Sequence, residues 1–316
     1  MIIPTLIVLL FPAANDKGMD GEQNGKEDAE VVIPVYRTAQ KQVEKVEIEQ
    51  YVAGVLSSEM PADFEMEALK AQAIAARTYI VKQLLSPSDI QLPEEAVVTD
   101  TVRHQVYHNE EELKKLWGKA FKRKYKRIMQ AVQETKGTII TYNGEPITAS
   151  FFSTSNGYTE NAEDYWNHSI PYLKSVSSPW DKQSPKYKTV MKIPVREFEE
   201  KLQVTLPNEK EIGKVIKRTK GKRIALIEIG GKTFTGREVR EKLNLPSTDF
   251  TFVRNNSTIV VQTKGYGHGV GMSQYGANGM AKEGKTAEEI LQYYYQGTKI
   301  EQIDALEEKL SKIGKN

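Results

Sequence analysis

Two neighbouring stretches of the chain have the spacing of apolar residues that is typical of α-helices. From Met66 onward, apolar residues recur at steps of three and four, which places them on one stripe of a helix and predicts that this stripe is buried. The stripe consists of Leu69, Ala73, Ala76, Ile80 and Leu84. Because most of these residues are alanines, another backbone or an extended ligand can approach the helix closely. An earlier helix, from about Ile48 to Ser58, should end before Pro61, since proline disfavours helix at its own position and at the preceding residue.

Glu59 falls at the predicted break between these two helices. Its neighbours Met60, Pro61 and Phe64 are apolar and would exclude water, which raises the pKa of a carboxyl towards the value that a general acid needs. A glutamate near a helix end is also often solvated, so the residues alone leave both interpretations open. Arg77 borders the buried stripe, where it would hold a substrate oxygen or orient the glutamate. The alternative is a structural ion pair.

The segment after the second helix contains two histidines. Residues 86–101 include two prolines and scattered polar groups and are predicted to form a loop. Residues 102–108 then alternate in polarity, which predicts a strand. His104 and His108 would share one face of this strand but lie too far apart to chelate one metal ion. We therefore expect two solvated or hydrogen-bonded histidines, with no bound metal and no cofactor.

Residues 110–135 have the pattern of one long, highly charged helix. Its predicted core face consists of Leu113, Leu116, Ala120, Ile128 and Val132. The basic residues of the KAFKRKYKR segment fall mostly on the other face, so we interpret them as a solvated surface, with binding of an anionic polymer as the alternative. Since 44 basic residues nearly balance 42 acidic ones, the overall charge gives no reason to expect binding to nucleic acid.

Residues 137–152 predict a β-hairpin whose turn is Asn143-Gly144, because these residue types adopt positive φ at little cost. A run of small hydroxyl and amide side chains follows. The run consists of Ser153, Thr154, Ser155, Asn156 and Gly157. Such side chains would suit a sugar-binding rim and would equally suit an ordinary turn. Tyr165 and Trp166 come next and either offer faces for stacking sugar rings or form a buried aromatic cluster.

A second glycine-rich region follows a stretch of different character. Between residues 184 and 257, strand-like runs and one helix (236–243) alternate with charged turns and predict a small inserted α+β subdomain. A strand then leads into a loop with glycine at four alternate positions, 265 to 271. This spacing does not fit a dinucleotide-binding loop, so it indicates either tight backbone packing or a bulky polymer lying against the loop. The polar residues of this region are His268, Ser273, Gln274 and Tyr275.

These patterns predict an α+β fold, with a mixed helix and sheet core interrupted by the inserted α+β subdomain. The apolar residues 1–13 suggest a truncated signal peptide or membrane anchor, and the polar residues 14–30 suggest a disordered tether. The core would comprise residues 31–183 and 258–301 around the insertion at 184–257, and residues 302–316 would form a charged tail. The chain contains no cysteine, which excludes disulfides and thiolate nucleophiles.

Three stretches, in this order, resemble the stage II sporulation protein D family, whose members are cell-wall lytic transglycosylases related to enhancers of cell-wall amidases. The first is SSEMP followed by EALKAQAIAARTY, the second is FFSTSNGYTE at residues 151–160, and the third is GYGHGVGMSQYGANGMA at residues 265–281. Three ordered motifs are more specific than any single one.

The resemblance implies that Glu59 is a single catalytic residue. It would protonate the oxygen between N-acetylmuramic acid and N-acetylglucosamine and then accept the proton of the muramyl 6-hydroxyl, which closes a 1,6-anhydro ring. A hydrolytic glycosidase would normally need two carboxylates instead. The residues expected to contact the saccharide are Gln72, Arg77, Ser153, Ser155, Asn156, Tyr158, His268, Ser273, Gln274 and Tyr275.

The resemblance also implies partners and a location. The substrate would be peptidoglycan glycan strands already stripped of stem peptides, during engulfment in a sporulating Gram-positive bacterium. The expected partners are a sporulation amidase/endopeptidase and a membrane protein of the same engulfment complex, on the outer side of the mother-cell membrane at the septum, where an N-terminal segment would anchor the chain. The alternatives are a noncatalytic enhancer of an amidase, which would bind glycan and its partner protein, and a structural scaffold.

Overall fold

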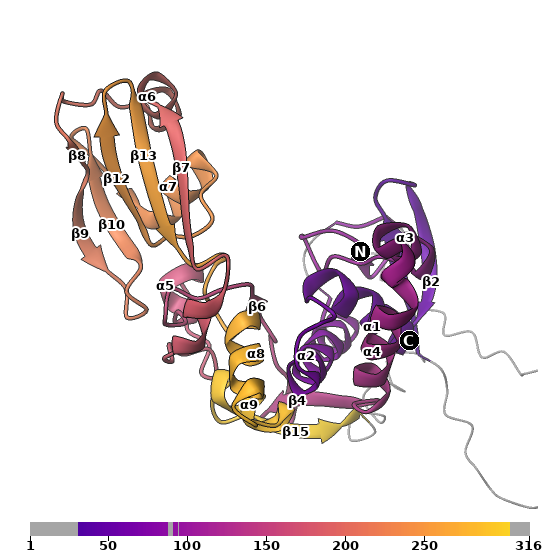
Figure 1. Ribbon diagram of the computed structural model, residues 1–316. Coiled ribbons are helices and arrows are strands. Elements are labelled where there is room, and N and C mark those ends of the chain that lie inside the picture. The colour runs from indigo at the N-terminus through magenta and orange to yellow at the C-terminus, as the bar shows by residue number, and fades with distance from the viewer. Residues whose placement is uncertain (1–30, 88–90, 94, 304–316) are drawn as a thin grey trace, which may run out of the picture.

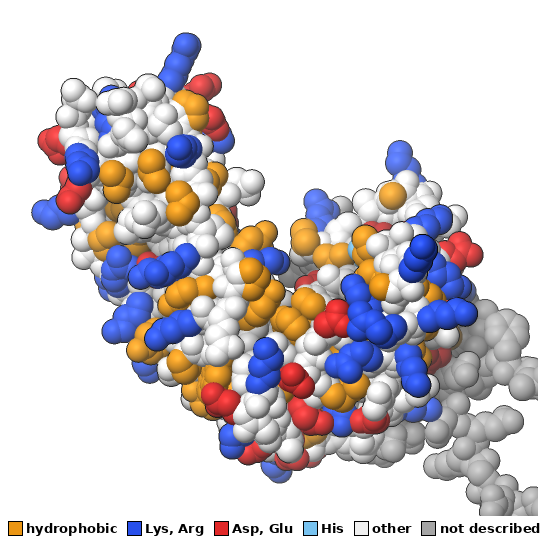
Figure 2. Space-filling view, viewed as in Figure 1, with side chains coloured by type: hydrophobic (Ala, Val, Ile, Leu, Met, Phe, Trp, Pro, Cys, Tyr) orange, Lys and Arg blue, Asp and Glu red, His pale blue; other side chains and the backbone are white. Residues whose placement is uncertain are grey.

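The computed structural model describes residues 31–87, 91–93 and 95–303, and its helices and strands form two lobes (Figure 1). One hydrophobic core contains residues from Ile33 to Tyr295, so both ends of the described chain contribute to the larger lobe. A second core contains residues from Ile193 to Val261 and fills the smaller lobe. The helices and small sheets of both lobes confirm the predicted α+β class. The space-filling view shows an open hollow between the lobes (Figure 2).

The larger lobe is built around α2, which packs against four other helices. These elements are α1 (Ile48–Glu59), α2 (Met66–Leu85), α4 (Phe121–Gln133), α8 (Gln274–Lys282) and α9 (Ala287–Tyr294). The predicted stripe of α2 is buried except at Leu84, which is half-buried. Gln72 and Thr78 lie outside that stripe and are fully buried as well. Protein therefore surrounds α2 on nearly all sides, which its small alanine side chains permit.

Three small sheets border these helices. The first has the order β2-β1-β3 and the second the order β15-β4-β5, while β6 and β14 form a parallel pair. Their bounds are β1 (Val32–Arg37), β2 (Gln42–Glu47), β3 (Val98–Thr99), β4 (Thr138–Tyr142), β5 (Glu145–Pro146), β6 (Phe151–Phe152), β14 (Met272–Ser273) and β15 (Lys299–Gln302). The predicted hairpin turn is confirmed, because Asn143 and Gly144 have φ of 53° and 76°.

The smaller lobe contains a four-stranded sheet of order β7-β13-β12-β8 and a three-stranded sheet of order β11-β10-β9. Its elements are β7 (Lys188–Pro194), α6 (Val195–Leu202), β8 (Glu211–Ile212), β9 (Lys214–Arg218), β10 (Ile224–Ile229), β11 (Lys232–Thr235), α7 (Gly236–Leu243), β12 (Phe250–Asn255) and β13 (Thr258–Lys264). Because β13 pairs with both β7 and β12, residues 258–264 lie in the sheet of this lobe and not in the second part of the core, where we had placed them.

Two predictions for the segment between α2 and β4 are wrong. Residues 102–108 form no strand and run as an irregular segment after β3. The helix predicted over residues 110–135 divides into α3 (Glu110–Trp117), a 3₁₀ turn (Gly118–Ala120) and α4. The division occurs at Gly118, whose φ of 49° is incompatible with a continuous right-handed helix. As a result Leu116 is 63% exposed and does not join the core.

The predicted anchor and tether, and nearly all of the predicted charged tail, lie outside the described residues. Two short elements complete the part that is described, α5 (Ala162–Trp166) and a 3₁₀ helix (Pro179–Gln183). Within that part, no helix combines the length and the apolar character needed to cross a membrane.

Candidate active site

Glu59 is the last residue of α1 and lies where the chain leaves the helix. Met60 has extended backbone angles, φ −130° and ψ 138°, and Pro61 follows, so the predicted break is confirmed. Arg127 of α4 holds the turn between α1 and α2 through hydrogen bonds to two of its carbonyl oxygens, at 2.9 and 2.7 Å. The sequence at the end of α1 thus produces a glutamate on a fixed turn.

The Glu59 carboxyl is half-buried and accepts hydrogen bonds from two neutral groups, the backbone N–H of Val106 and the side chain of Gln274. Burial raises the pKa of Glu59 above its ordinary value of 4.5, and the two hydrogen bonds offset part of this rise. The predicted direction of the pKa shift is therefore confirmed. Val106 could not be predicted as a neighbour, because it lies in the irregular segment that we had interpreted as a strand.

The third sequence motif reaches Glu59 through Gln274, and the second motif lies beside the third. The parallel pairing of β6 with β14 sets the serine run beside the end of the glycine loop. The backbone N–H of Tyr275 donates to the carbonyl oxygen of Ser153 at 3.1 Å, so α8 begins next to the serine run. Ser153 and Tyr275 are half-buried, and the Tyr275 ring packs edge-to-face against Phe64 with centroids 5.0 Å apart. Of the residues expected at the site, Gln274, Tyr275 and Ser153 therefore lie in this region.

Gln72 lies behind Gln274 as seen from Glu59. It is fully buried, and its Oε1 accepts a long hydrogen bond from Gln274 Nε2 at 3.4 Å. Gln72 is therefore a neighbour of the site that a saccharide cannot reach.

The glycine loop owes its spacing to close packing. Its four alternate glycines all have positive φ, from 80° to 113°. At Gly271 a Cβ atom would lie 2.0 Å from the carbonyl oxygen of Ser150, so a side chain there would collide with backbone. Of our two interpretations of this loop, the structure favours tight backbone packing.

Ser155 and Ser273 do not face a groove, contrary to our expectation. Both are fully buried and donate to Asp181, from Ser155 Oγ at 2.8 Å and from Ser273 Oγ at 2.6 Å. Ser178 Oγ also donates to this carboxylate, at 2.6 Å. Asp181 thereby ties the serine run to the start of α8. We did not single out Asp181 from the sequence, because it belongs to neither motif that it connects.

Asn156 and Tyr158 face the smaller lobe. Asn156 is 8% exposed, and its Nδ2 donates to Gly221 O at 3.1 Å and to Asp249 Oδ2 at 3.0 Å. Tyr158 is 39% exposed, and the Lys222 ammonium lies 5.6 Å from its ring centroid. These contacts join the lobes, so Asn156 has no free amide to offer a saccharide.

His268 lies in an aromatic cluster. Its ring centroid is 5.7 to 5.8 Å from those of Phe152, Tyr165 and Trp166. Burial lowers the pKa of His268 to about 4, with further contributions from the charges of Arg240 and Arg223. Its Nδ1 accepts the backbone N–H of Val270 at 3.0 Å, so the imidazole is neutral at pH 7 and already hydrogen-bonded. Of the two interpretations of Tyr165 and Trp166, the structure favours the aromatic cluster.

Arg77 is an internal ion-pair residue, the second of our two interpretations. Its side chain is fully buried, and its Nε and Nη2 donate to both carboxylate oxygens of Glu49 at 2.9 and 2.5 Å. It also donates to the carbonyl oxygen of Thr138 at 3.1 Å. Arg77 therefore joins α2 to α1 and β4, and its guanidinium is not available to hold a saccharide.

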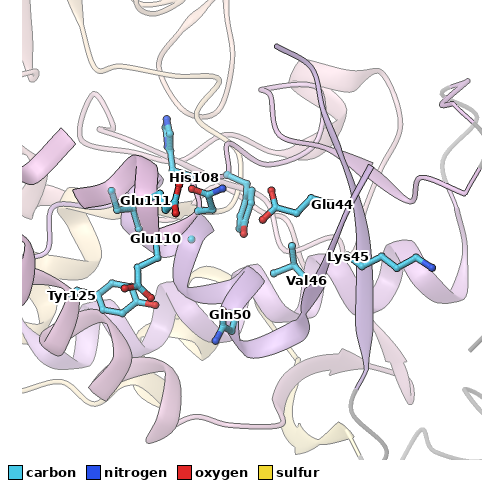
Figure 3. A pocket seen from close by; sticks show the side chains of 12 residues that line it. Glu44, Lys45, Val46, Gln50, His108, Glu110, Glu111 and Tyr125 are labelled. Carbon is cyan, nitrogen blue, oxygen red and sulfur yellow. The ribbon is translucent and has the colours of Figure 1, made fainter. Parts of the chain in front are cut away.

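A separate surface pocket of about 380 Å³ is lined by residues of β2, α1 and α3 (Figure 3). Gln50 and Gly54 of α1 face this pocket. Glu59 is rotated from them by about 180° and about 140° around the helix axis. The pocket therefore lies on another face of α1 and is not part of the candidate site.

Both histidines of the irregular segment are hydrogen-bonded, as one of our two options predicted. His104 Nδ1 accepts the backbone N–H of Thr99 at 3.2 Å, and His108 Nδ1 lies 2.8 Å from Ser58 Oγ. Across residues 31–87, 91–93 and 95–303, no group of three or more His, Cys, Asp or Glu is placed to hold a metal ion.

The structure thus defines an α+β protein with a half-buried glutamate that is hydrogen-bonded by Gln274, at the point where α8 begins beside the serine run. A family model described as Stage II sporulation protein matches residues 36–142, which include Glu59 and Gln72. The chain is 52% identical to the stage II sporulation protein D of Bacillus subtilis (strain 168) over 319 aligned residues. The aligned region covers 96% of this chain and 93% of that protein.

Two other relatives extend the comparison. The stage II sporulation protein D of Bacillus amyloliquefaciens is 47% identical, over 96% of this chain and 93% of that protein. The amidase enhancer of Bacillus subtilis (strain 168) is 28% identical, over 78% of this chain and 39% of that protein. The chain therefore belongs to the stage II sporulation protein D family, a family involved in sporulation.

Proposed function

We propose that this protein is a lytic transglycosylase that cleaves peptidoglycan glycan strands between N-acetylmuramic acid and N-acetylglucosamine during engulfment. The observation that carries the proposal is the environment of Glu59. Its pKa is raised by burial and is moderated only by two neutral hydrogen bonds, from Val106 and Gln274. A carboxyl whose pKa is raised in this way keeps its proton to higher pH than an exposed glutamate does, and it remains half-accessible, as a general acid must.

In this mechanism one carboxyl performs both proton transfers. Protonated Glu59 gives its proton to the glycosidic oxygen, and the resulting carboxylate then accepts the proton of the muramyl 6-hydroxyl as that oxygen attacks the anomeric carbon. The 1,6-anhydro ring closes without water, so a second carboxylate is not needed. The half-buried side chains of Ser153 and Tyr275 are the residues that we assign to saccharide contact. General acid catalysis contributes on the order of 10² to 10⁴-fold in rate.

The amidase enhancer among the relatives supports a second candidate function, in which the chain binds glycan and raises the activity of a partner amidase without cleaving glycan itself. Under either function we place the protein on the outer side of the mother-cell membrane at the septum. We propose an amidase/endopeptidase and a membrane protein of the engulfment complex as its partners, and glycan stripped of stem peptides as its substrate.

The products formed by the isolated chain distinguish the two functions. Purified protein incubated with denuded glycan strands should yield anhydro-terminated fragments, which are lighter by one water than hydrolysis products in a mass spectrum. The Glu59→Ala variant should yield none. The matched control is Glu65→Ala, which removes an exposed glutamate from the start of α2, where its side chain makes no capping hydrogen bond. Absence of anhydro products from the wild-type chain, together with stimulation of an added amidase, would establish the enhancer function instead.

A further inference from the structure

The side chains of Gln274 and Gln72 form a short chain of amides that begins at the Glu59 carboxyl. Gln274 donates a hydrogen bond to Glu59, and its Nε2 lies 3.4 Å from Gln72 Oε1. Gln274 is 5% exposed and Gln72 is fully buried. Among the described residues, Gln72 Nε2 has no hydrogen-bond partner. A buried amide nitrogen with two unused hydrogens is destabilising, so this atom needs an explanation.

A ligand does not supply the missing partner, because Gln72 Nε2 is sealed from solvent. Turning the Gln72 amide alone does not supply it either. Nε2 of Gln72 would then face Nε2 of Gln274, and two donors would oppose each other. Gln72 Nε2 gains an acceptor only if Gln274 turns as well and presents its Oε1 to both neighbours. The Glu59 carboxyl would then have to be a donor, which it is when it is protonated.

We propose that Gln72 and Gln274 form an amide switch that follows the proton on Glu59. When Glu59 is ionised, Gln274 directs its NH₂ group to the carboxylate and to Gln72 Oε1, as the structure shows. When Glu59 is protonated, both amides turn, Gln274 Oε1 accepts the Glu59 O–H, and Gln72 Nε2 donates to the same oxygen. The amides neither gain nor lose a proton, so Gln72 and Gln274 are positioning residues in this scheme.

The switch rests on the proposed function, in which the same carboxyl donates a proton and then accepts one. A donor that cannot turn, such as the backbone N–H of Val106, favours the ionised form of Glu59 and opposes its reprotonation. An amide has nearly the same shape with its oxygen and nitrogen exchanged, so the switch can serve both forms without moving the backbone. Glu59 therefore keeps a hydrogen bond in each half of the reaction.

The direct test follows the two side-chain amides by NMR in the full chain labelled with ¹⁵N-glutamine. The signals are assigned by their loss in Gln72→Met and Gln274→Met. Both should shift with one common pH midpoint, and Glu59→Gln should abolish both transitions. The buried Gln83 of the same helix serves as the internal control, and its amide should not follow this midpoint. A Gln72 amide that ignores the titration of Glu59 would overturn the switch.

A kinetic test separates positioning from substrate binding. Gln72→Met should lower kcat for glycan cleavage by about 2- to 10-fold, which corresponds to the loss of one hydrogen bond, and should leave KM unchanged because the saccharide does not reach this residue. Gln83→Met, a matched replacement in the same helix, should leave both constants unchanged. An unchanged kcat in a folded Gln72→Met protein would contradict the switch, and so would a change in KM alone.

These results are independent of the test of the proposed function. If Glu59→Ala abolishes the anhydro products while the Gln72 amide stays indifferent to pH, only the switch is wrong. If the amides follow Glu59 but the Glu59→Ala variant still makes anhydro products, the proposed mechanism is wrong and the coupling of the amides to the carboxyl stands.

Discussion

Among the described residues, burial raises the pKa values of three carboxyls, Glu59, Glu160 and Asp181. The first two lie in very different places. Glu59 is half-buried at the end of α1 and is hydrogen-bonded by neutral groups. Glu160 is 2% exposed at the junction of the lobes, where Arg223 Nε lies 3.6 Å from its Oε1 and Thr219 Oγ1 donates to it at 2.8 Å. Burial raises the pKa of Glu160 to about 7. The comparison shows that a raised pKa does not by itself mark a catalytic acid, because only Glu59 is accessible to a substrate.

The largest effect that we predict concerns a different carboxylate, Glu49, and its buried partner Arg77. Arg77→Met should lower the free energy of unfolding by about 3–5 kcal/mol, because it leaves the Glu49 carboxylate, whose side chain is only 14% exposed, without its cationic partner. The matched control is Arg123→Met, which breaks an exposed pair with Asp63 and should change the stability far less. Urea unfolding at pH 7 measures both. Weaker glycan binding without loss of stability in Arg77→Met would restore Arg77 as a saccharide ligand.

The second prediction concerns the junction of the lobes. Because the pKa of Glu160 is raised from 4.5 to about 7 in the folded protein, the folded state binds this proton more tightly than the unfolded state does. The contribution of Glu160 to the free energy of unfolding is fully present below pH 4.5 and is lost as pH rises through about 7. The loss amounts to at most about 3 kcal/mol. Unfolding measured against pH should show this decline in the wild type.

Glu160→Gln tests the origin of that decline. Glutamine cannot ionise, so the variant should lose the decline and become more stable than the wild type above pH 7. A variant that keeps the same pH dependence as the wild type would assign the decline to other groups.

The third and smallest effect concerns the pH profile of glycan cleavage. The wild-type rate should fall as pH rises through the pKa of Glu59, because only the protonated carboxyl can act as the acid. Gln274→Met removes a hydrogen bond that lowers this pKa, so the falling limb should move to higher pH. Rates over a pH series give the shift directly. A shift to lower pH would contradict the hydrogen bond that Gln274 donates to Glu59.

Local patterns predicted the elements that local forces determine. Helix periodicity and Pro61 predicted where α1 ends and where α2 begins, on either side of the break at Glu59. The Asn143-Gly144 pair predicted the hairpin turn. In the smaller lobe, α7 begins and ends at the predicted residues, 236 and 243. The prediction failed at Gly118, because a single glycine within a charged helical pattern does not reveal that the chain takes a positive φ there.

The partners of buried polar residues could not be predicted, because they depend on how distant elements pack. Asp181 binds Ser155 and Ser273, which lie 26 and 92 residues away in the sequence. Arg77 and Glu49 lie on different helices, and their pairing follows from the packing of α1 on α2. Some of the residues that we expected to line a sugar-binding rim are therefore buried and hydrogen-bonded to other side chains. Of the predicted features of this region, the break in the chain at Glu59 is the one that the local sequence determines.

The central claim is that Glu59, and not merely some buried carboxyl, supplies the proton for glycan cleavage. The most direct measurement compares cleavage rates of denuded glycan by Glu59→Gln and Glu160→Gln, with both variants shown to be folded under the assay conditions. We predict that Glu59→Gln is slower than the wild type by about 10² to 10⁴-fold, while Glu160→Gln cleaves at the wild-type rate. Equal rates in the Glu59→Gln variant and the wild type would contradict the account.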